Sequence, residues 1–296
     1  MLSFETRELA RTPMPPSAPA AAIRQYSGLL ARQALAALHG ELLLYPKPGL
    51  VSPVDTGSHT DMDAATFMRS LFTLRHYFVR VASAGAAGAR FASLRELGIT
   101  AERRMLLATG GVNTHRGAIF SLGLLCAALG RLHARGMPAT PAAVRAILML
   151  CWGEELARHA DGGDDGSHGA AVARSHAAGG AREEAALGMP AVFEVGMPVL
   201  RASLAAGRGQ QRARIDTLFA LMAQVGDTNV LFRGGAAGAA FVRDTAADFI
   251  ASGGTGNPQW RSRAVDAHHA FVARQLSPGG AADLLAATCL VHACTV

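Results

Sequence analysis

The chain has 296 residues, of which 50% are hydrophobic and 6% aromatic, and its formal charge is +6. A half-apolar chain of this length can bury a large core, which excludes extended disorder, and its few β-branched and aromatic residues favour an all-α fold in a single globular bundle. The dispersed arginines, with only three Tyr and two Trp, argue against nucleic-acid binding and favour small anionic ligands.

The chain is expected to begin with a flexible lead at residues 1–22, where Pro, Ala and Ser dominate, followed by a catalytic domain at 23–296. The lead has no apolar segment of signal-peptide length, and the apolar run from Ala118 to Gly130 is too short to cross a bilayer. The four cysteines include no C-x-x-C pair. We therefore expect a soluble cytoplasmic protein with no membrane partner.

Apolar residues at helical spacing predict eleven helices after the lead. Gly110 and Gly111 end the third helix, and Ser277 with Pro278 forms an N-cap and N1 pair that opens the last one. The predicted ranges are 23–43, 63–84, 99–109, 115–135, 140–160, 168–187, 191–206, 210–225, 235–251, 258–275 and 278–294.

Two blocks before the second helix carry charged side chains. Lys47 lies between two prolines, which stiffen its backbone and let its ammonium be aimed at a phosphate, although an exposed loop lysine is the simpler interpretation. His59, Asp61 and Asp55 form a polar loop whose carboxylates suit Mg²⁺. The alternative is that Asp61 or Asp63 only caps the next helix.

The segment Asn113–Gly117 places polar and cationic side chains at the start of a long apolar helix. Asn113 and Thr114 are good N-cap residues. A helix N-terminus offers unpaired N–H groups and the positive end of a dipole, so His115 and Arg116 indicate a phosphate site. An ordinary capped helix with a solvated arginine explains the same residues.

Arg182 and Glu184 stand two positions apart and therefore face different sides of a predicted helix. Arg182 can grip a phosphate with its planar guanidinium while Glu184 serves as a metal ligand or base. A charged surface helix is the alternative. The acidic segment 161–168 lacks the spacing of a calcium loop and is interpreted as a solvated loop.

Two further segments join helices. The first segment contains Asp227–Asn229 and Arg233. Its carboxylate could lie near a metal and its arginine near a phosphate, or the segment could be a plain helix–helix connection with caps. Ser277–Gly280 is either a backbone nest for phosphate or a plain helix start, and Asp283 is a ligand or a surface acid.

Six separated blocks occur in an order that resembles the triphosphoribosyl-dephospho-coenzyme A synthase family over roughly residues 25–294. The segment Ser52–Asp55 is similar to the malonate decarboxylase branch, since the citrate lyase branch more usually has Asp at position 52. Arg116 stands where the family more usually has Lys, which keeps the charge but changes its geometry. The blocks are Tyr45–Val51, Gly57–Met62, Asn113–Gly117, Gly180–Ala185, Asp227–Gly235 and Ser277–Asp283.

The resemblance implies a transferase that joins the 5-triphosphoribosyl group of ATP to the 2′-hydroxyl of 3′-dephospho-coenzyme A and expels adenine. The product would be the prosthetic-group precursor for the acyl-carrier subunit of malonate decarboxylase. Mg²⁺ is the expected cofactor, and a homodimer is left open. Two competing hypotheses are an all-helical Mg²⁺-dependent hydrolase of N-glycosidic or ADP-ribosyl bonds, and a non-catalytic chaperone of the acyl-carrier subunit.

The same chemistry suggests a role for each candidate residue, because an oxocarbenium-like sugar, an attacking hydroxyl and a departing base need carboxylates, a base and a proton donor. The expected catalytic residues are Asp61 and Glu184 as base or metal ligand and His59 and His115 as donor. The expected metal ligands are Asp55, Asp61, Glu184 and Asp227. The expected substrate-binding residues are Lys47, Asn113, Thr114, Arg116, Arg182, Asn229, Arg233, Ser277, Gly279 and Gly280.

Overall fold

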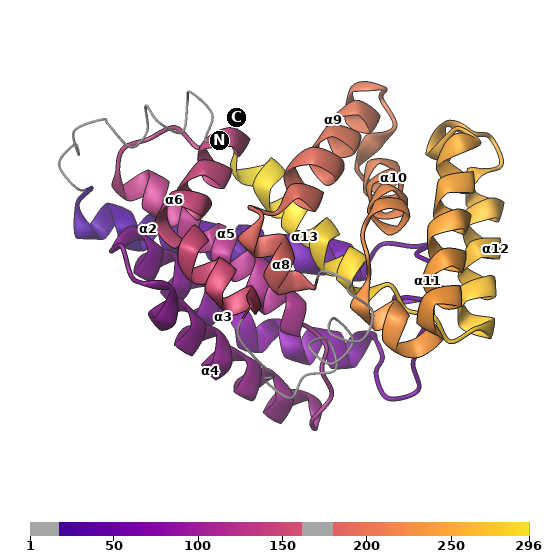
Figure 1. Cartoon of the computed structure of the whole chain (residues 1–296), viewed down its shortest axis with the longest axis horizontal. Helices are drawn as coiled ribbons and strands as arrows, with labels where there is room; N and C mark the ends of the chain where they lie inside the picture. The colour runs from indigo at the N-terminus through magenta and orange to yellow at the C-terminus, as the bar shows by residue number, and fades with distance from the viewer. Residues whose placement is uncertain (1–17, 162–179, 296) are drawn as a thin grey trace.

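The computed structural model describes residues 18–161 and 180–295, and over these residues it consists of helices without a strand (Figure 1). The all-α prediction is confirmed. A π-helical turn, η1 (Ala191–Gly196), precedes α9, and a 3₁₀ turn, η2 (Gly254–Gly256), precedes α12. The α-helices are α2 (Ala20–Leu42), α3 (Ala64–Ala86), α4 (Phe91–Thr109), α5 (Arg116–Ala134), α6 (Pro141–Asp161), α8 (Ala181–Ala186), α9 (Met197–Ala205), α10 (Gly209–Gln224), α11 (Thr228–Ala251), α12 (Trp260–Ala273) and α13 (Gly279–Cys294).

Two predicted helix starts are wrong, and glycine is involved in both. Helix α4 begins eight residues before its predicted start and continues through Gly98, whose nearest neighbours leave ordinary contact distances. Helix α11 begins seven residues before its predicted start. Gly235 lies inside α11 with φ 60° and ψ −161°, a backbone conformation open to glycine, so the predicted start marks a kink within the helix.

Parts of three other predictions lie outside the described residues. These are residues 1–17 of the predicted lead, residues 162–168 of the predicted solvated loop, and residues 168–179 of the predicted sixth helix. The last three residues of the predicted lead are helical, because α2 begins at Ala20. The end of α4 is as expected, since Gly110 closes it in the left-handed conformation with φ 68°.

Helix α5 forms the centre of the core. Within the part of the chain that the structure describes, it is the one helix long and apolar enough to cross a membrane, and 78% of its apolar window is buried inside the protein. It contacts α2, α3, α4, α6, α8 and α13. The whole helix has 19 residues and is longer than the apolar run from Ala118 to Gly130. Its burial inside the protein, and not its length, therefore identifies it as a core helix.

Small residues bring α3 and α5 close together. A Cβ atom on Gly85 would lie 2.2 Å from the carbonyl oxygen of Ala127, and one on Gly130 would lie 2.3 Å from that of Ala82. Glycine is therefore required at both crossings. Helices α2–α6 lie on one side of Figure 1 and α9–α12 on the other, while α13 runs between them and contacts α2, α5, α9, α10 and α11.

A buried carboxylate joins the elements on the second side. Asp216 of α10 accepts hydrogen bonds from the hydroxyl of Ser203 at 2.6 Å and the guanidinium of Arg208 at 2.8 Å. It also accepts the backbone N–H and the hydroxyl of Thr255 in η2, each at 2.7 Å. This Asp216 junction therefore ties α9, α10 and η2 together.

Candidate active site

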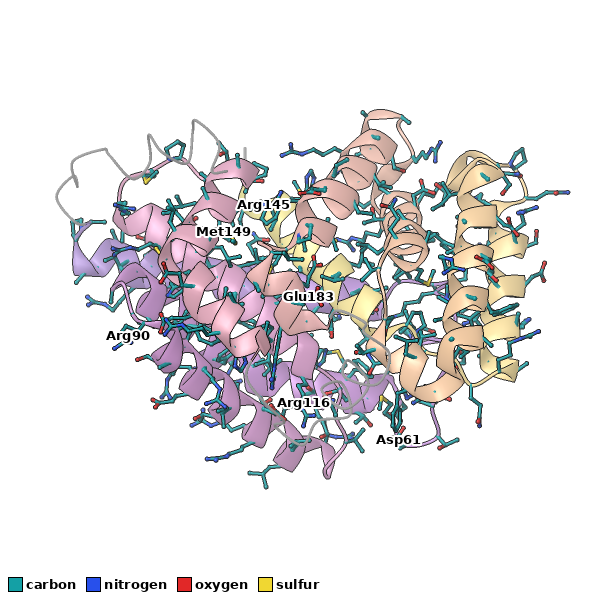
Figure 2. The ribbon with its side chains drawn as sticks, viewed as in Figure 1. Asp61, Arg90, Arg116, Arg145, Met149 and Glu183 are labelled. Carbon is teal, nitrogen blue, oxygen red and sulfur yellow. The ribbon has the colours of Figure 1, made fainter. Side chains whose placement is uncertain are left out.

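A pocket with a volume of about 1550 Å³ opens where α2, α3, α4, α5, α6, α8, α11 and α13 meet. Small-molecule pockets usually span about 300–1,000 Å³, so this one has room for more than one ligand. Figure 2 shows Arg116, Glu183 and Asp61, three of its lining residues, around this part of the molecule. With the exception of Asp55, every residue expected to act in the site lines this pocket.

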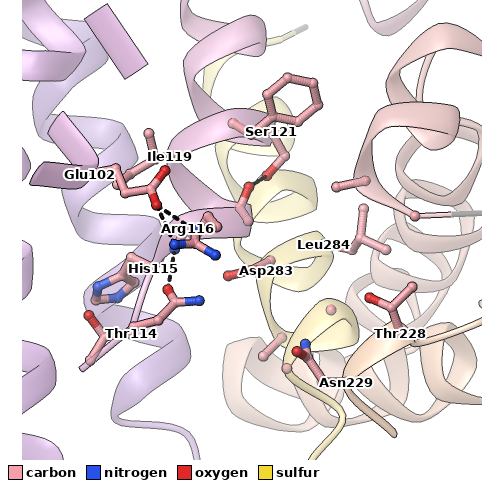
Figure 3. Close-up of a pocket in the computed structure, with 18 of the residues that line it drawn as sticks. Glu102, Thr114, His115, Arg116, Ile119, Ser121, Thr228, Asn229, Asp283 and Leu284 are labelled. Atoms are coloured by element: carbon pink, nitrogen blue, oxygen red, sulfur yellow. Dashed lines mark hydrogen bonds and ion pairs between the residues drawn. The ribbon is translucent and has the colours of Figure 1, made fainter. Parts of the chain in front are cut away.

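The start of α5 forms one wall of the pocket. The N-cap of α5 is His115 and not Asn113 or Thr114 as expected, but the side-chain oxygen of Asn113 still accepts the backbone N–H of Arg116 at 3.1 Å. The guanidinium of Arg116 is paired with Glu102 of α4, with 2.6 Å between Nε and the carboxylate (Figure 3). The hydroxyl oxygen of Thr114 is buried and has no hydrogen-bond partner among the described residues. This wall therefore has an anchored cation and an unsatisfied polar atom.

His115 is held rigidly behind this wall. Its Nδ1 lies 2.6 Å from the hydroxyl of Ser70, its ring meets Phe67 edge-on, and only 3% of the residue is exposed. Burial and, to a smaller extent, the charge of Lys47 lower the pKa of His115 to about 3. At neutral pH the imidazole is therefore uncharged, and a neutral imidazole is a very weak acid.

Lys47 is buried, so the interpretation of an exposed loop lysine is wrong. Only 2% of it is exposed, and its ammonium lies 2.5 Å from the carboxylate of Glu41 at the end of α2. Burial lowers the pKa of Lys47, while Glu41 opposes that shift. Both residues line the pocket. A phosphate bound here would meet an ion pair and not a free cation.

Asp55 lies outside the pocket and supports this loop. Its carboxylate is 3.2 Å from Nε2 of His268, whose Nδ1 lies 3.0 Å from the backbone carbonyl of Lys47. Its other oxygen accepts the backbone N–H of Gly57 at 2.8 Å. The contacts of Asp55 therefore favour a structural role over the expected role as a metal ligand.

A histidine network links the loop before α3 to α11 and α13. The Arg233 guanidinium donates to Nδ1 of His59 at 3.1 Å, which leaves the proton on Nε2, 2.8 Å from the Ser277 hydroxyl. Burial lowers the pKa of His59, and the charge of Arg233 acts in the same direction. Asp61 is 3.6 Å from Nδ1, and 58% of its side chain is exposed.

Contrary to prediction, Ser277 binds His59 and does not cap α13, which starts two residues later.

Asp227 caps two helices at once. Its Oδ1 accepts the backbone N–H of Asn229 at 2.9 Å in α11, and its Oδ2 accepts that of Ala281 at 3.1 Å in α13. The N–H of Gly280 is also bonded to this carboxylate. The expected phosphate nest at Gly279 and Gly280 is therefore partly filled by Asp227, and these contacts favour the cap over the metal ligand.

Arg182 and Glu184 both line the pocket from α8. One carboxylate oxygen of Glu184 accepts the backbone N–H of Ala191 at 2.6 Å. Burial raises the pKa of Glu184, which is the shift expected of a carboxylate that serves as a base near neutral pH. The two side chains thus belong to the pocket wall and not to a purely solvated helix.

The described residues contain no group of three or more His, Cys, Asp or Glu side chains able to hold a metal ion. Of the four expected ligands, Asp55 and Asp227 are engaged as above, and Asp61 is the most accessible. A closed protein cage for Mg²⁺ is therefore absent from the described part. Mg²⁺ is commonly held by one or two carboxylates together with substrate phosphates, and Asp61 meets that lesser requirement.

Three acidic residues of the pocket were not considered as site residues: Glu41, Glu102 and Glu183. Glu41 had a readable signal, because it falls on the buried stripe of α2 that contains Ala34, Ala37 and Leu38, where an acid requires a partner. Glu102 had no such local signal, because its importance comes from its contact with Arg116 of α5. Asp283, which the sequence left open as a ligand or a surface acid, lines the pocket.

Comparison with known proteins gives one consistent result. A model of the ATP:dephospho-CoA triphosphoribosyl transferase family matches residues 27–296. A protein of Acinetobacter calcoaceticus named probable 2-(5''-triphosphoribosyl)-3'-dephosphocoenzyme-A synthase is 38% identical over 90% of this chain and 91% of its own length. A Pectobacterium atrosepticum protein named as the same synthase is 40% identical, over 86% of each chain. No solved structure matches this chain.

Proposed function

The chain belongs to the ATP:dephospho-CoA triphosphoribosyl transferase family, and from this membership we infer that it is a triphosphoribosyl-dephospho-coenzyme A synthase. It transfers the 5-triphosphoribosyl group of ATP to the 2′-hydroxyl of 3′-dephospho-coenzyme A. The C1′–N9 bond of ATP breaks, a C1′–O bond forms, and adenine leaves. The triphosphate serves as a handle and stays on the transferred sugar.

The observation that carries this proposal is one pocket, of about 1550 Å³, lined by residues from all six blocks of the family resemblance. Two nucleotide substrates require more room than a usual small-molecule pocket provides. They also bring several phosphates, and the pocket wall contains the basic side chains of Lys47, Arg116, Arg182 and Arg233. Size and charge thus both suit two anionic nucleotides.

The proposal assigns the phosphates to the arginines and the proton of the 2′-hydroxyl to Glu184. Arg116 is planar, charged and already oriented by Glu102, so a phosphate can bind its remaining N–H groups without reordering the side chain. Glu184 is the expected base whose surroundings raise its pKa toward neutrality. Arg233 orients His59 and supports the loop carbonyl of Ser58, which it reaches at 3.0 Å.

Mg²⁺ is proposed to enter with the triphosphate, which supplies most of its oxygen ligands. Asp61 is the residue best suited to add a carboxylate, because it lines the pocket and keeps 58% of its side chain exposed. When bound, the ion would neutralise phosphate charge and orient the triphosphate.

The deciding experiment incubates the pure protein with Mg²⁺, ATP and 3′-dephospho-coenzyme A and analyses adenine and coenzyme A derivatives by mass spectrometry. Equal amounts of adenine and a triphosphoribosyl adduct are expected. Adenine release that ignores the acceptor would instead identify a hydrolase. Tight binding of an acyl-carrier subunit with no nucleotide turnover would identify a chaperone. Ordinary coenzyme A should be a poor acceptor, because its 3′-phosphate crowds the neighbouring 2′-hydroxyl.

The product is proposed to supply the acyl-carrier subunit of malonate decarboxylase in the cytoplasm. The support is the segment Ser52–Asp55, where the Ser52 hydroxyl accepts the backbone N–H of Val54 at 3.1 Å and stabilises the turn. Cells that lack this protein should contain malonate decarboxylase without its prosthetic group, while a citrate lyase in the same cells keeps its own. The reverse result would assign the citrate lyase branch.

The homodimer is tested separately, by sedimentation of the pure protein.

A further inference from the structure

Asp283 lies in the first turns of α13, at the point where this helix meets the beginning of α5. The residue is partly buried and lines the pocket. Figure 3 shows it on α13, facing the strip of pocket wall that carries Arg116. Its position deep among helices and its access to the pocket set it apart from Asp61, which is largely exposed.

The first turn of α5 holds the carboxyl group in place. Asp283 accepts the backbone N–H of Ala118, one of the N–H groups that a helix leaves unpaired at its start. Gly117 next to it has no side chain, and a Cβ atom there would lie 2.1 Å from Oδ2 of Asp283. The missing side chain therefore lets the carboxyl group approach the backbone of α5 closely.

The charges around Asp283 oppose its ionisation. The groups that act on it are the carboxylates of Glu41 in α2 and Asp227 at the start of α11. Burial raises the pKa of Asp283 well above its ordinary value, those two acids raise it further, and the Ala118 N–H opposes the shift. Glu41 is already paired with Lys47, so that cation does not serve Asp283. Burial and these two acids therefore favour the protonated form of the Asp283 carboxyl group.

We propose that Asp283 is the catalytic acid that protonates the departing adenine. This inference rests on the proposed function. The two histidines expected as donors are less suitable: His115 is a buried neutral imidazole, and His59 already directs its proton to Ser277. Asp283 is a carboxylic acid in the pocket with one oxygen anchored by a backbone N–H.

The step balances as follows. The C1′–N9 bond breaks and its electron pair goes to adenine, which takes the proton of Asp283 on a ring nitrogen. The oxygen of the 2′-hydroxyl attacks C1′ and gives its proton to Glu184. Adenine leaves as a neutral molecule, Asp283 is left ionised, and transfer of a proton from Glu184 through solvent restores both groups.

The test compares wild type with Asp283→Asn, using ATP and N7-methyl-ATP as donors and adenine or N7-methyladenine release as the readout. Asparagine keeps an oxygen to accept the Ala118 N–H but cannot supply the proton. With ATP, kcat should fall about 10²–10⁴-fold, the usual contribution of a general acid. With N7-methyl-ATP the base is already positively charged and leaves without a proton, so the variant should come within about tenfold of wild type.

Asp244→Asn is the matched control, because it makes the same change on an exposed residue away from the pocket. It should leave both rates unchanged, and thermal unfolding checks that each variant is folded. Equal losses with both donors, or an Asp283→Asn variant with normal kcat, would overturn the proposal.

The readout separates this proposal from the proposed function. If wild type cleaves ATP but forms no coenzyme A adduct, the synthase assignment fails, and the donor comparison still decides the role of Asp283. If wild type cleaves neither donor, both proposals fail.

Discussion

Asp216 and Asp283 are both carboxylates packed between helices, but their surroundings differ. Asp216 receives four hydrogen bonds, one of them from the cation of Arg208. Asp283 receives a backbone N–H, and its charged neighbours are other acids. A carboxylate surrounded by hydrogen-bond donors holds elements together, whereas burial beside like charges favours the protonated form of a carboxyl group, which can then give its proton away.

The largest expected effect tests the structural half of this comparison. Asp216→Asn should lower the free energy of unfolding by about 3 kcal/mol, the lower end for breaking a buried ion pair, because Arg208 keeps 31% of its side chain exposed. Urea unfolding followed by circular dichroism measures it. The kcat of the remaining folded protein should be normal. A loss of kcat without a loss of stability would show that Asp216, like Asp283, has a role in catalysis and not in stability.

The second effect tests how strictly the acid is positioned. Gly117→Ala puts a methyl group where Oδ2 of Asp283 lies and should move the carboxyl group, so kcat should fall about 10²-fold, as for a misplacement of about 1 Å. Stability should change little, since alanine favours the helix.

Gly28→Ala is the control for this substitution. Gly28 is also helical, and nothing lies within 4 Å of the position its Cβ would take. It should leave kcat unchanged and raise the free energy of unfolding by up to about 1 kcal/mol. Normal kcat in Gly117→Ala would show that the close approach of Asp283 to α5 has no catalytic importance.

A third test extends the comparison to a buried base. The unfolded His115 side chain binds a proton near pH 6.5, whereas the folded one resists protonation down to about pH 3. The unfolded state therefore binds more protons between these values, and stability falls as the pH falls. The free energy of unfolding should drop by roughly 1 kcal/mol between pH 6 and pH 5 through this group.

His115→Gln removes the titrating ring, so its unfolding energy should depend less on pH in this range. Unfolding curves at pH 7, 6 and 5 measure both slopes. The Asp216 junction contains no histidine among its partners, so Asp216→Asn should keep the wild-type slope in this range. A His115→Gln slope equal to that of wild type would contradict the assignment.

The smallest expected effect concerns the exposed acid of the pocket. Asp61→Asn should change the free energy of unfolding by no more than about 0.5 kcal/mol, as is usual at exposed positions. At limiting Mg²⁺ the apparent KM for ATP should rise, and excess Mg²⁺ should reverse the rise by mass action. A defect that persists at saturating Mg²⁺ would identify Asp61 as a base instead.

The helices were largely predictable, because apolar spacing is a local property of the chain. The buried stripe of α2 and the apolar run of α5 each appear within a few turns of sequence. The start of α11 was missed because Gly235 looked like a boundary, while the structure uses it as a kink. Local spacing does not distinguish the two.

The sequence predicted which residues belong to the site, but not how they contact one another. The family blocks identified residues that line one pocket, yet they did not show which were already engaged. Asp227 and Ala281 are 54 positions apart, and Arg116 and Glu102 are 14 apart. Such contacts depend on helix packing. The charge state of Asp283 depends on them as well, since Glu41 and Asp227 come from other helices.

The double cap at Asp227 bears on the recombination of related genes. This residue holds the starts of α11 and α13 together through backbone N–H groups, which every residue except proline provides. The joint does constrain one position of the partner segment, because a Cβ atom on Gly280 would lie 3.0 Å from Oδ2 of Asp227. A chimaera with its crossover between α11 and α13 should therefore retain the joint if it keeps Asp227 from one parent and a glycine at position 280 from the other.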